Sequence, residues 1–179
     1  MLPSRHVTVS DMTDQSSTEQ SDQIIRFDSR GEAKSLALQL AQQARREICF
    51  FGNSLDPVMF DNTEFIDCIS EFARRNQKTS VKFAVHSTQQ NVVDGHRLIA
   101  LAQRLTSAFH IHKTAVQHQD LPEMFLLVDD HAYLHCLNYQ RHEGRASFNS
   151  PLEVRSMKQK FNDIWNHSTA DISTRRLHI

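Results

Sequence analysis

A chain of 179 residues is long enough for one α/β domain with tails, and too short for two domains that each have a core. Its 20 basic and 21 acidic residues give a formal net charge of -1, which excludes an overall field that draws the protein to nucleic acid or to an anionic membrane. Any binding of that kind must come from a local patch of charge.

The first segment, residues 1–23, is rich in Ser, Thr, Asp and Gln and poor in large apolar residues. Such a segment buries too little to offset the entropy of ordering, so we predict a disordered N-terminal tail. It has no apolar core of signal-peptide length, and no later run approaches a membrane span. The three cysteines lie in apolar segments without metal-like spacing. These features predict a cytoplasmic protein with reduced thiols and no membrane association.

The next segment, residues 24–168, alternates helical and strand patterns and predicts a single α/β domain, with residues 169–179 as a C-terminal tail. Apolar residues at helical spacing predict three helices, over about 31–47, from Asp61 with a capping-box-like Glu64, and from about Thr88 with Leu98, Leu101 and Leu105. Short apolar or alternating runs predict strands at 48–52, 81–87 and 109–114.

Two further runs, EMFLLVDD and AYLHCLN, are close enough in sequence to form an antiparallel hairpin around Asp129, Asp130 and His131. Ser150 and Pro151 then supply the N-cap and the first position of a last helix. Strands separated by helices, closing with a hairpin and a helix, predict a mixed β-sheet covered by helices on both faces.

The hairpin and the last helix carry a resemblance to a known family. MFLLVDDHAYLHCLNYQ, followed by FNSPLEVRSMKQKFNDIWNHS, resembles one half of the phospholipase D superfamily. In that family a strand carries H-x-K and, four residues later, an aspartate; a second strand ends near an asparagine, and a helix closes the unit. The resemblance covers roughly residues 32–168, and it implies an α/β fold with a mixed sheet sandwiched by helices.

The sequence departs from this family at the residues that carry its chemistry. If Asp129 is the motif aspartate, the histidine and lysine positions hold Pro122 and Met124; if it is Asp130, they hold Glu123 and Phe125. The family's reaction needs an imidazole nucleophile and a cation on the phosphate oxygens, and neither register supplies them. The resemblance therefore implies a non-catalytic domain without catalytic residues or a cofactor, acting in binding or assembly. A complete family site also pairs two motifs, which one half provides only as a dimer or with a partner.

Five residues near the lost motif are the candidate ligand contacts: Lys113, Asp129, His135, Asn138 and Arg141. Cationic and amide donors suit phosphate, so the expected ligand is nucleic acid or another phosphate compound. The other expected partner is a protein, or a second copy of this chain bound through the sheet. The simpler interpretation of these residues is a set of solvated loops, with Asp129 and Asp130 in an exposed turn.

The eleven histidines leave two alternatives open. A phosphodiesterase or nuclease could use the non-standard histidines His110, His112 or His135 around Asp129, with or without a second subunit. His110 and His112 also project from one strand face, where they could hold a transition metal with Asp129 or Asp130. No established metal-binding spacing accompanies them, so surface histidines are the simpler interpretation and no metal site is predicted.

Overall fold

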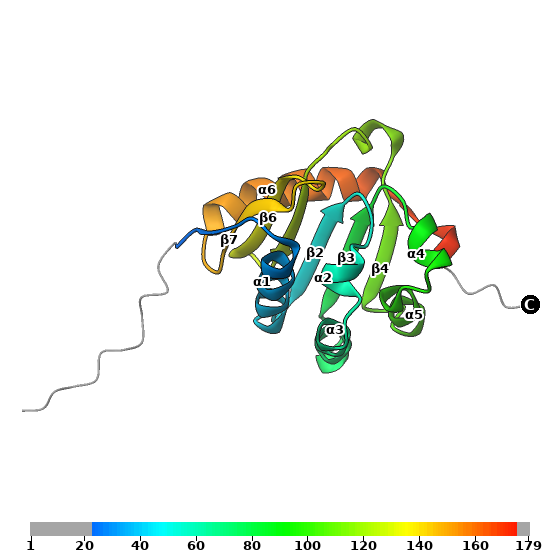
Figure 1. The fold of residues 1–179 in the computed structure, drawn as a ribbon. Coiled ribbons are helices and arrows are strands. Elements are labelled where there is room, and N and C mark those ends of the chain that lie inside the picture. The colour runs from blue at the N-terminus through cyan, green and yellow to red at the C-terminus, as the bar shows by residue number, and fades with distance from the viewer. Residues whose placement is uncertain (1–22, 175–179) are drawn as a thin grey trace, which may run out of the picture.

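An eight-stranded mixed sheet forms the centre of the computed structural model, which describes residues 23–174 (Figure 1). The strands are β1 (Ile25–Phe27), β2 (Glu47–Gly52), β3 (Ser80–Val85), β4 (Phe109–Lys113), β5 (Met124–Val128), β6 (Ala132–Asn138), β7 (Glu143–Ser147) and β8 (Thr169–Ala170). Their spatial order is β1-β7-β6-β5-β2-β3-β4-β8. The predicted N-terminal tail lies outside the described residues except for Gln23, and so do residues 175–179.

The helices are α1 (Arg30–Gln42), α2 (Pro57–Phe60), α3 (Thr63–Arg75), α4 (Gln89–Val93), α5 (Arg97–Arg104) and α6 (Pro151–His167), with short 3-10 turns η1 (Val116–His118) and η2 (Ile172–Thr174). The parallel strands β2, β3 and β4 are connected through helices, as parallel strands require. The strands β5, β6 and β7 form an antiparallel meander that continues the sheet beyond β2.

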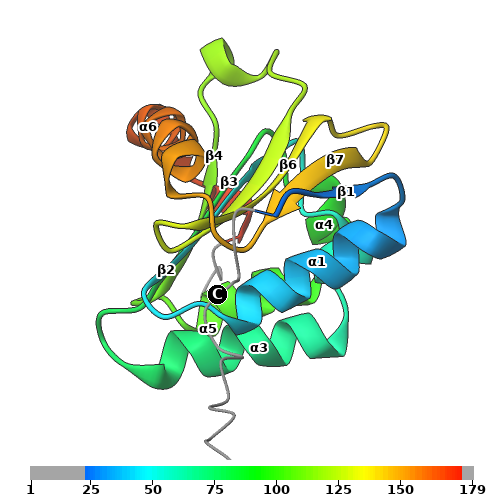
Figure 2. The same cartoon turned by 90° about the vertical axis from the view of Figure 1, so that its left-hand side faces the viewer.

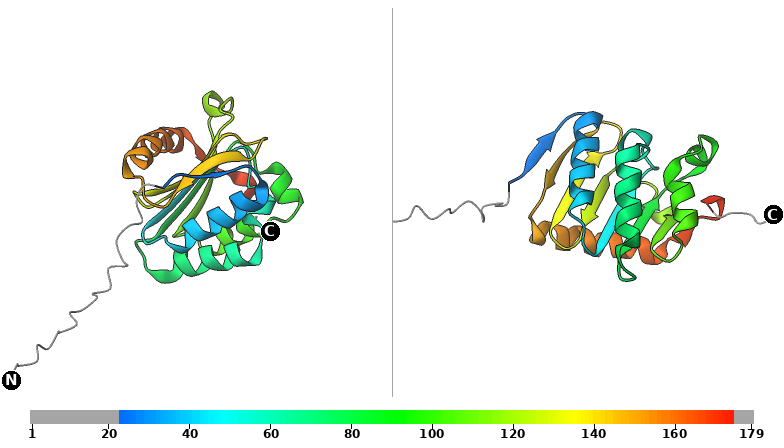
Figure 3. Two further views of the ribbon diagram at one scale, coloured as in Figure 1. Left: turned by 60° about the vertical axis from the view of Figure 1, so that its left-hand side comes forward. Right: turned by 90° about the horizontal axis from the view of Figure 1, so that it is seen from below.

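The two faces of the sheet are covered unequally. Helices α1, α3 and α5 lie against one face, and α6 runs alone across the other (Figures 2 and 3). Because side chains alternate along a strand, neighbouring aromatic residues of β2 pack into different cores, one on each face of the sheet. Phe50 joins the larger core beneath α1, α3 and α5, whereas Phe51 packs with Phe125 and Phe161 beneath α6. The predicted mixed sheet with helices on both faces is confirmed.

The predicted hairpin is also confirmed, because β5 and β6 pair antiparallel around the turn at residues 129–131. Two helix predictions need correction. Asn62, not Asp61, caps α3, through a hydrogen bond that its side chain accepts from the Phe65 amide at 3.0 Å. The helix expected from Thr88 is two helices, since Gly95 adopts a φ of 69° between them and His96 caps the second.

Three strands were not predicted. β1, β7 and β8 are short, and β7 has the polar sequence EGRAS, so neither length nor alternation marks them. Partners supplied by the rest of the sheet organise these strands: β1 pairs with β7, and β8 pairs with β4. Contacts of the described chain therefore continue past residue 168, where the Gln103 side chain also donates to the carbonyl oxygen of Thr174 at 2.8 Å. Among the described residues, no helix is long and apolar enough to span a membrane.

Candidate functional site

The turn between β5 and β6 holds two adjacent aspartates with different surroundings. The carboxylate of Asp129 accepts hydrogen bonds from three successive backbone amides, those of Arg45, Arg46 and Glu47, at 3.0, 2.8 and 2.9 Å. Asp130 is exposed and pairs with the Arg46 guanidinium at 2.8 Å. Asp129 is therefore no exposed turn residue: it anchors the connection from α1 to β2, and its oxygens are occupied by the protein's own backbone.

The positions that the family motif gives to histidine and lysine are also structural here. In the register of Asp129, Met124 is buried in the larger core, and the Pro122 carbonyl accepts the Tyr139 amide at 2.9 Å. In the other register, Phe125 is buried beneath α6. Glu123 forms an ion pair with Lys160, and its carboxylate also contacts Nε2 of His135. Neither pair of positions presents an imidazole beside a cation.

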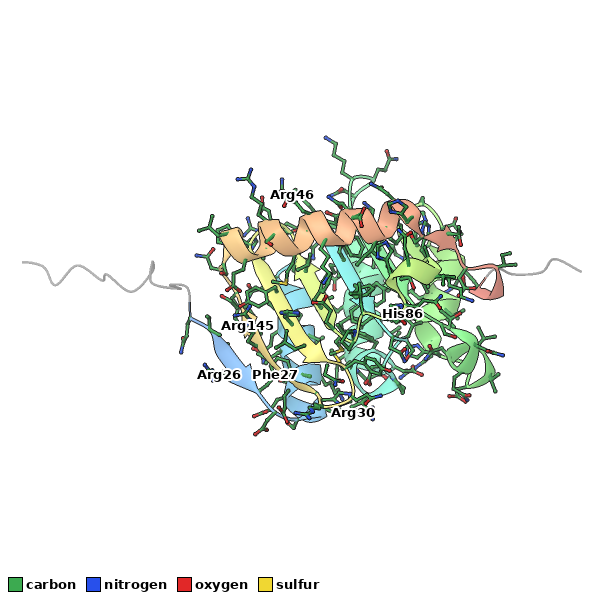
Figure 4. The ribbon with its side chains drawn as sticks, turned by 90° about the horizontal axis from the view of Figure 1, so that it is seen from above. Arg26, Phe27, Arg30, Arg46, His86 and Arg145 are labelled. Carbon is green, nitrogen blue, oxygen red and sulfur yellow. The ribbon has the colours of Figure 1, made fainter. Side chains whose placement is uncertain are left out.

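His135 is a buried residue of β6 whose Nε2 lies 2.9 Å from a carboxylate oxygen of Glu123. Desolvation by burial lowers its pKa, and the charge of Arg145 adds to this effect. Arg145 of β7 lies directly opposite His135 of β6 and directly opposite Arg26 of β1, so the three side chains share one row of the sheet. Figure 4 labels Arg26 and Arg145. Like charges directly opposite one another are unfavourable, and the ion pair of Arg145 with Glu153 at 3.6 Å compensates only in part.

The remaining candidate contacts do not converge. Asn138 and Arg141 share the turn after β6, where the Asn138 side chain accepts the Gln140 amide at 2.9 Å. Lys113 ends β4, which β5, β2 and β3 separate from β6, a span of about 19 Å at the usual strand spacing. Asp129 follows the carboxyl end of β5, which lies at the other end of the sheet from Lys113, Asn138 and Arg141. Val128, the last residue of β5, pairs with Ile48 near the start of β2. The five predicted contacts are thus spread over two ends of the sheet.

Basic residues gather at the amino ends of β2 and β3. Two open hollows of about 900 and 960 Å³ adjoin there and share Arg46 and the turn at residues 129–131. The first lies between the end of α1 and this turn, and the second runs along α6. Six basic and three acidic side chains line them: Arg45, Arg46, Arg75, Lys78, Arg155 and Lys158, with Glu47, Asp129 and Asp130. This is a formal excess of three positive charges on a chain whose net charge is -1.

Several of these cations are available to a ligand. Arg45, Lys78 and Arg155 are exposed, and they form no ion pair within residues 23–174. Asp129 uses its oxygens on backbone amides, and Glu47 pairs with Lys82 at 3.0 Å and with Lys158. Asp130 pairs with Arg46, so none of the three acidic groups forms an ion pair with Arg45, Lys78 or Arg155 in the part of the chain that the structure describes. Arg46 lies close to α6 in the view from above (Figure 4).

We call the two hollows together the groove. It was not predicted from the sequence. Arg45 and Arg46 had a local explanation, since cations stabilise the carboxyl end of a helix such as α1. Arg155 lies more than 100 residues further along the chain, and nothing local connects it with them. A sequence signal exists only for the arginine pair that follows α1.

The histidines do not form the metal site considered from the sequence. His110 and His112 do lie on one face of β4, but β3 and β2 separate that strand from β5 and its Asp129. His112 stacks on Trp165, with ring centroids 3.8 Å apart, and its Nδ1 lies 2.8 Å from the Ser168 hydroxyl. Burial, followed by the charges of His110 and Lys82, lowers the pKa of His112.

The buried thiols offer no nucleophile. Cys49 lies beneath α6, 3.1 Å from the Lys158 ammonium, and burial raises its pKa to about 12 despite that cation. Burial likewise raises the pKa of Cys136 to about 12. Nucleophilic cysteines need the thiolate near neutral pH, so both side chains are core residues.

Comparison with solved structures shows the class of fold. The chain is similar to Nuc from Salmonella typhimurium, a phospholipase D family member, with a TM-score of 0.57 and 16% identity over 84% of this chain and 99% of that one. It is similar to NucT from Helicobacter pylori, with a TM-score of 0.56 and 8% identity over the same shares. At these identities the likeness shows the fold alone, and the fold is phospholipase D-like.

A third similar structure is that of TrmBL2, described as an archaeal chromatin protein with a novel mode of DNA binding. Its TM-score is 0.60 with 12% identity, and the match covers 88% of this chain but 56% of TrmBL2, so this chain spans little more than half of that protein. No curated protein matches the sequence. A family model described as a domain of unknown function (DUF7931) matches residues 29–177, and the chain belongs to that family.

Proposed function

We propose that this protein is a non-catalytic phospholipase D-like domain that binds nucleic acid through the groove at the amino ends of β2 and β3. The observation that carries the proposal is the excess of exposed cations in the groove, on a chain with almost no net charge. Guanidinium groups bind phosphate oxygens in pairs of hydrogen bonds, and three of the groove's exposed cations have no protein partner among the described residues.

The residues at the positions of the family motif support the non-catalytic part of the proposal. Pro122 and Met124 stand where the family has its nucleophile and its phosphate-binding cation, and the carboxylate of Asp129 is engaged with three backbone amides. A phosphoryl transfer of the family type requires groups that these side chains cannot supply. DNA binding by TrmBL2, as its description states, agrees with the proposed ligand class.

Fluorescence anisotropy of short labelled DNA and RNA, titrated with the protein at low and at high salt, tests the proposal. We expect saturable binding that weakens steeply with salt, because phosphate contacts release counterions. In the double variant R45Q/R155Q the affinity should fall, and the slope of log K against log salt should become shallower by about 2. The variant R141Q removes one exposed arginine that the sequence analysis placed in the site, and it is the control for the single variants R45Q and R155Q.

Each result has a definite meaning. Loss of affinity in R141Q, with R45Q/R155Q unchanged, would move the site to the turn after β6. End-point mixtures run on a denaturing gel show whether the oligonucleotide stays intact; cleavage would favour the alternative, a phosphodiesterase or nuclease that uses non-standard histidines. Absence of any binding would contradict the proposal and favour a protein partner or a second copy of the chain.

A further inference from the structure

Three potential metal ligands from two distant segments meet near the carboxyl end of α6. Asp163 and His167 lie one helical turn apart on α6, so both side chains occupy the same face. His118 comes from η1, in the β4–β5 loop, which extends beyond the ends of the strands (Figure 1). One ligand atom from each of the three side chains lies within 4.8 Å of the other two.

The carboxylate lies between the two imidazoles. One Asp163 oxygen is 3.7 Å from Nε2 of His118, and the other is 3.5 Å from Nδ1 of His167. Ligand atoms around a tetrahedral zinc ion are about 3.3 Å apart, given metal–ligand distances near 2.0–2.1 Å. With ligand atoms up to 4.8 Å apart, the cluster is up to about 1.5 Å more open than a closed site, a difference that side-chain rotations can supply.

We infer that His118, Asp163 and His167 form a binding site for a divalent transition metal ion of the zinc class. Two imidazoles and one carboxylate are the donor set of zinc sites that keep a fourth position open, whereas Mg²⁺ and Ca²⁺ prefer ligand sets made of oxygen. The inference is independent of the proposed function, because the cluster and the groove share no residue.

Helix stabilisation alone does not account for the cluster. An aspartate and a histidine at i and i+4 near a helix end are favourable without any ligand. That local pairing gives no reason for His118, whose side chain is only 12% exposed, to meet the exposed Asp163 from another segment. The ring centroids of the two histidines lie 5.8 Å apart, close enough for both to reach one ion.

The surroundings also suit metal binding. Nδ1 of His167 lies 2.8 Å from the carbonyl oxygen of Asp163, and a hydrogen bond from Nδ1 to this oxygen leaves Nε2 as the ligand atom. A bond of this kind from the other ring nitrogen to a backbone carbonyl orients metal-binding histidines. At His118, the side-chain amide nitrogen of Gln117 lies 3.2 Å from Nε2, so a bound ion would displace that contact. A bound ion would tie the β4–β5 loop to α6.

The test uses full-length protein without a histidine tag, stripped with chelator and titrated with Co²⁺ and Zn²⁺ alone. We expect one equivalent of Co²⁺ to give the visible absorption of a low-coordinate complex with nitrogen ligands, and Zn²⁺ to displace it. Binding should fall at least tenfold in H118A and in D163N. Zn²⁺ should raise the thermal midpoint of the wild type by several degrees, and not that of H118A.

The control is H131A, which removes a histidine from the turn between β5 and β6, at the other end of β5 from the loop that carries His118. It should bind one equivalent with unchanged affinity. Wild-type protein without a saturable equivalent, or H118A and D163N that bind as the wild type does, would overturn the inference. Circular dichroism of each variant shows that the loss is not a failure to fold.

Discussion

At the scale of single residues, two neighbouring aspartates show how little a motif says about the role of its members. Asp129 adopts a φ of 54° and accepts three backbone hydrogen bonds, whereas Asp130 is exposed and has Arg46 and His131 as partners. Hydrogen bonds to a charged, partly buried acceptor stabilise a protein more than an exposed ion pair does. Asp129 is thus expected to matter for stability and Asp130 is not.

The substitution D129N should lower the free energy of unfolding by about 2–4 kcal/mol, because a neutral amide accepts these hydrogen bonds less well and turns its NH2 group toward at least one of the three backbone amides. Asparagine tolerates a positive φ, so the change tests the hydrogen bonds and not the backbone conformation. Urea unfolding measures the difference. The neighbouring D130N should change stability by less than about 0.5 kcal/mol, and equal effects of the two substitutions would contradict this account.

Glu47 is the residue through which pH should act on the attachment of α6. Burial alone would raise its pKa, but the hydrogen bonds and charges of Lys158 and Lys82 outweigh burial and hold the pKa below the usual 4.5. An acid whose pKa is lowered by folding contributes stability that is complete above the unfolded-state pKa and is lost as the pH falls through the folded-state value.

The variant E47Q should therefore be less stable than the wild type near neutral pH, and the difference should disappear well below pH 4.5. Urea unfolding of both proteins at the two pH values measures it, and taking the difference cancels the titration of the other carboxylates. A difference that stays constant with pH would show that the lost interaction is packing and not charge.

At the scale of elements, β7 depends on a glycine that pairing alone does not require. A Cβ atom at Gly144 would lie 2.3 Å from the His135 carbonyl oxygen and 2.5 Å from Cζ of Phe27. The first of these atoms is backbone and cannot move away without breaking the pairing of β6 with β7. The close approach of three strands therefore needs a residue without a side chain at this position.

We expect G144A to cost about 1–3 kcal/mol, as overpacking of a buried site does. Gly31 in α1 provides the matched control, because a Cβ atom at that position would have no neighbour within 4 Å and alanine favours helix. G31A should leave stability unchanged or raise it by up to about 1 kcal/mol. Thermal or urea unfolding compares the two, and a neutral G144A would mean that β7 shifts to accept the methyl group.

At the scale of the whole molecule, the last described residues close the sheet on the side of β4. Thr169 and Ala170 pair with Lys113 and His112, and the Asp171 amide donates to the Ile111 carbonyl oxygen at 3.2 Å. Without this strand, β4 would become the edge of the sheet, and an uncovered edge exposes unpaired backbone groups. Stability should therefore extend past the boundary that sequence patterning placed at residue 168.

Deletion of residues 169–179 should lower the thermal midpoint by about 2–8 °C, since it removes one to two kcal/mol or more of pairing from a domain of this size. Deletion of residues 1–22, which precede β1, should leave the midpoint unchanged if that segment is the predicted tail. Differential scanning calorimetry of the two truncated proteins measures both thermal midpoints and tests both predictions. An unchanged midpoint without residues 169–179 would restore the boundary at residue 168.

The sequence by itself determined the class of fold, and it is the basis of the proposal that the motif is lost. Alternating helical and strand patterns are local, so they predicted the mixed sheet, the hairpin of β5 with β6 and the last helix. The residues at the motif positions can likewise be read directly, and Pro122 and Met124 need no structure to be recognised. Local patterns failed at the short edge strands β1 and β8 and at the polar strand β7, all of which form through pairing with other strands of the sheet.

Only the tertiary structure decided where the functional groups gather. The amides that occupy Asp129 come from residues more than 80 positions earlier, the groove joins Arg45 to Arg155, and His118 meets α6 across about 45 residues. Such contacts follow from strand order and helix placement and not from spacing along the chain. For the same reason Lys113, Asn138 and Arg141 seemed to belong together by sequence, while the sheet separates the first from the other two.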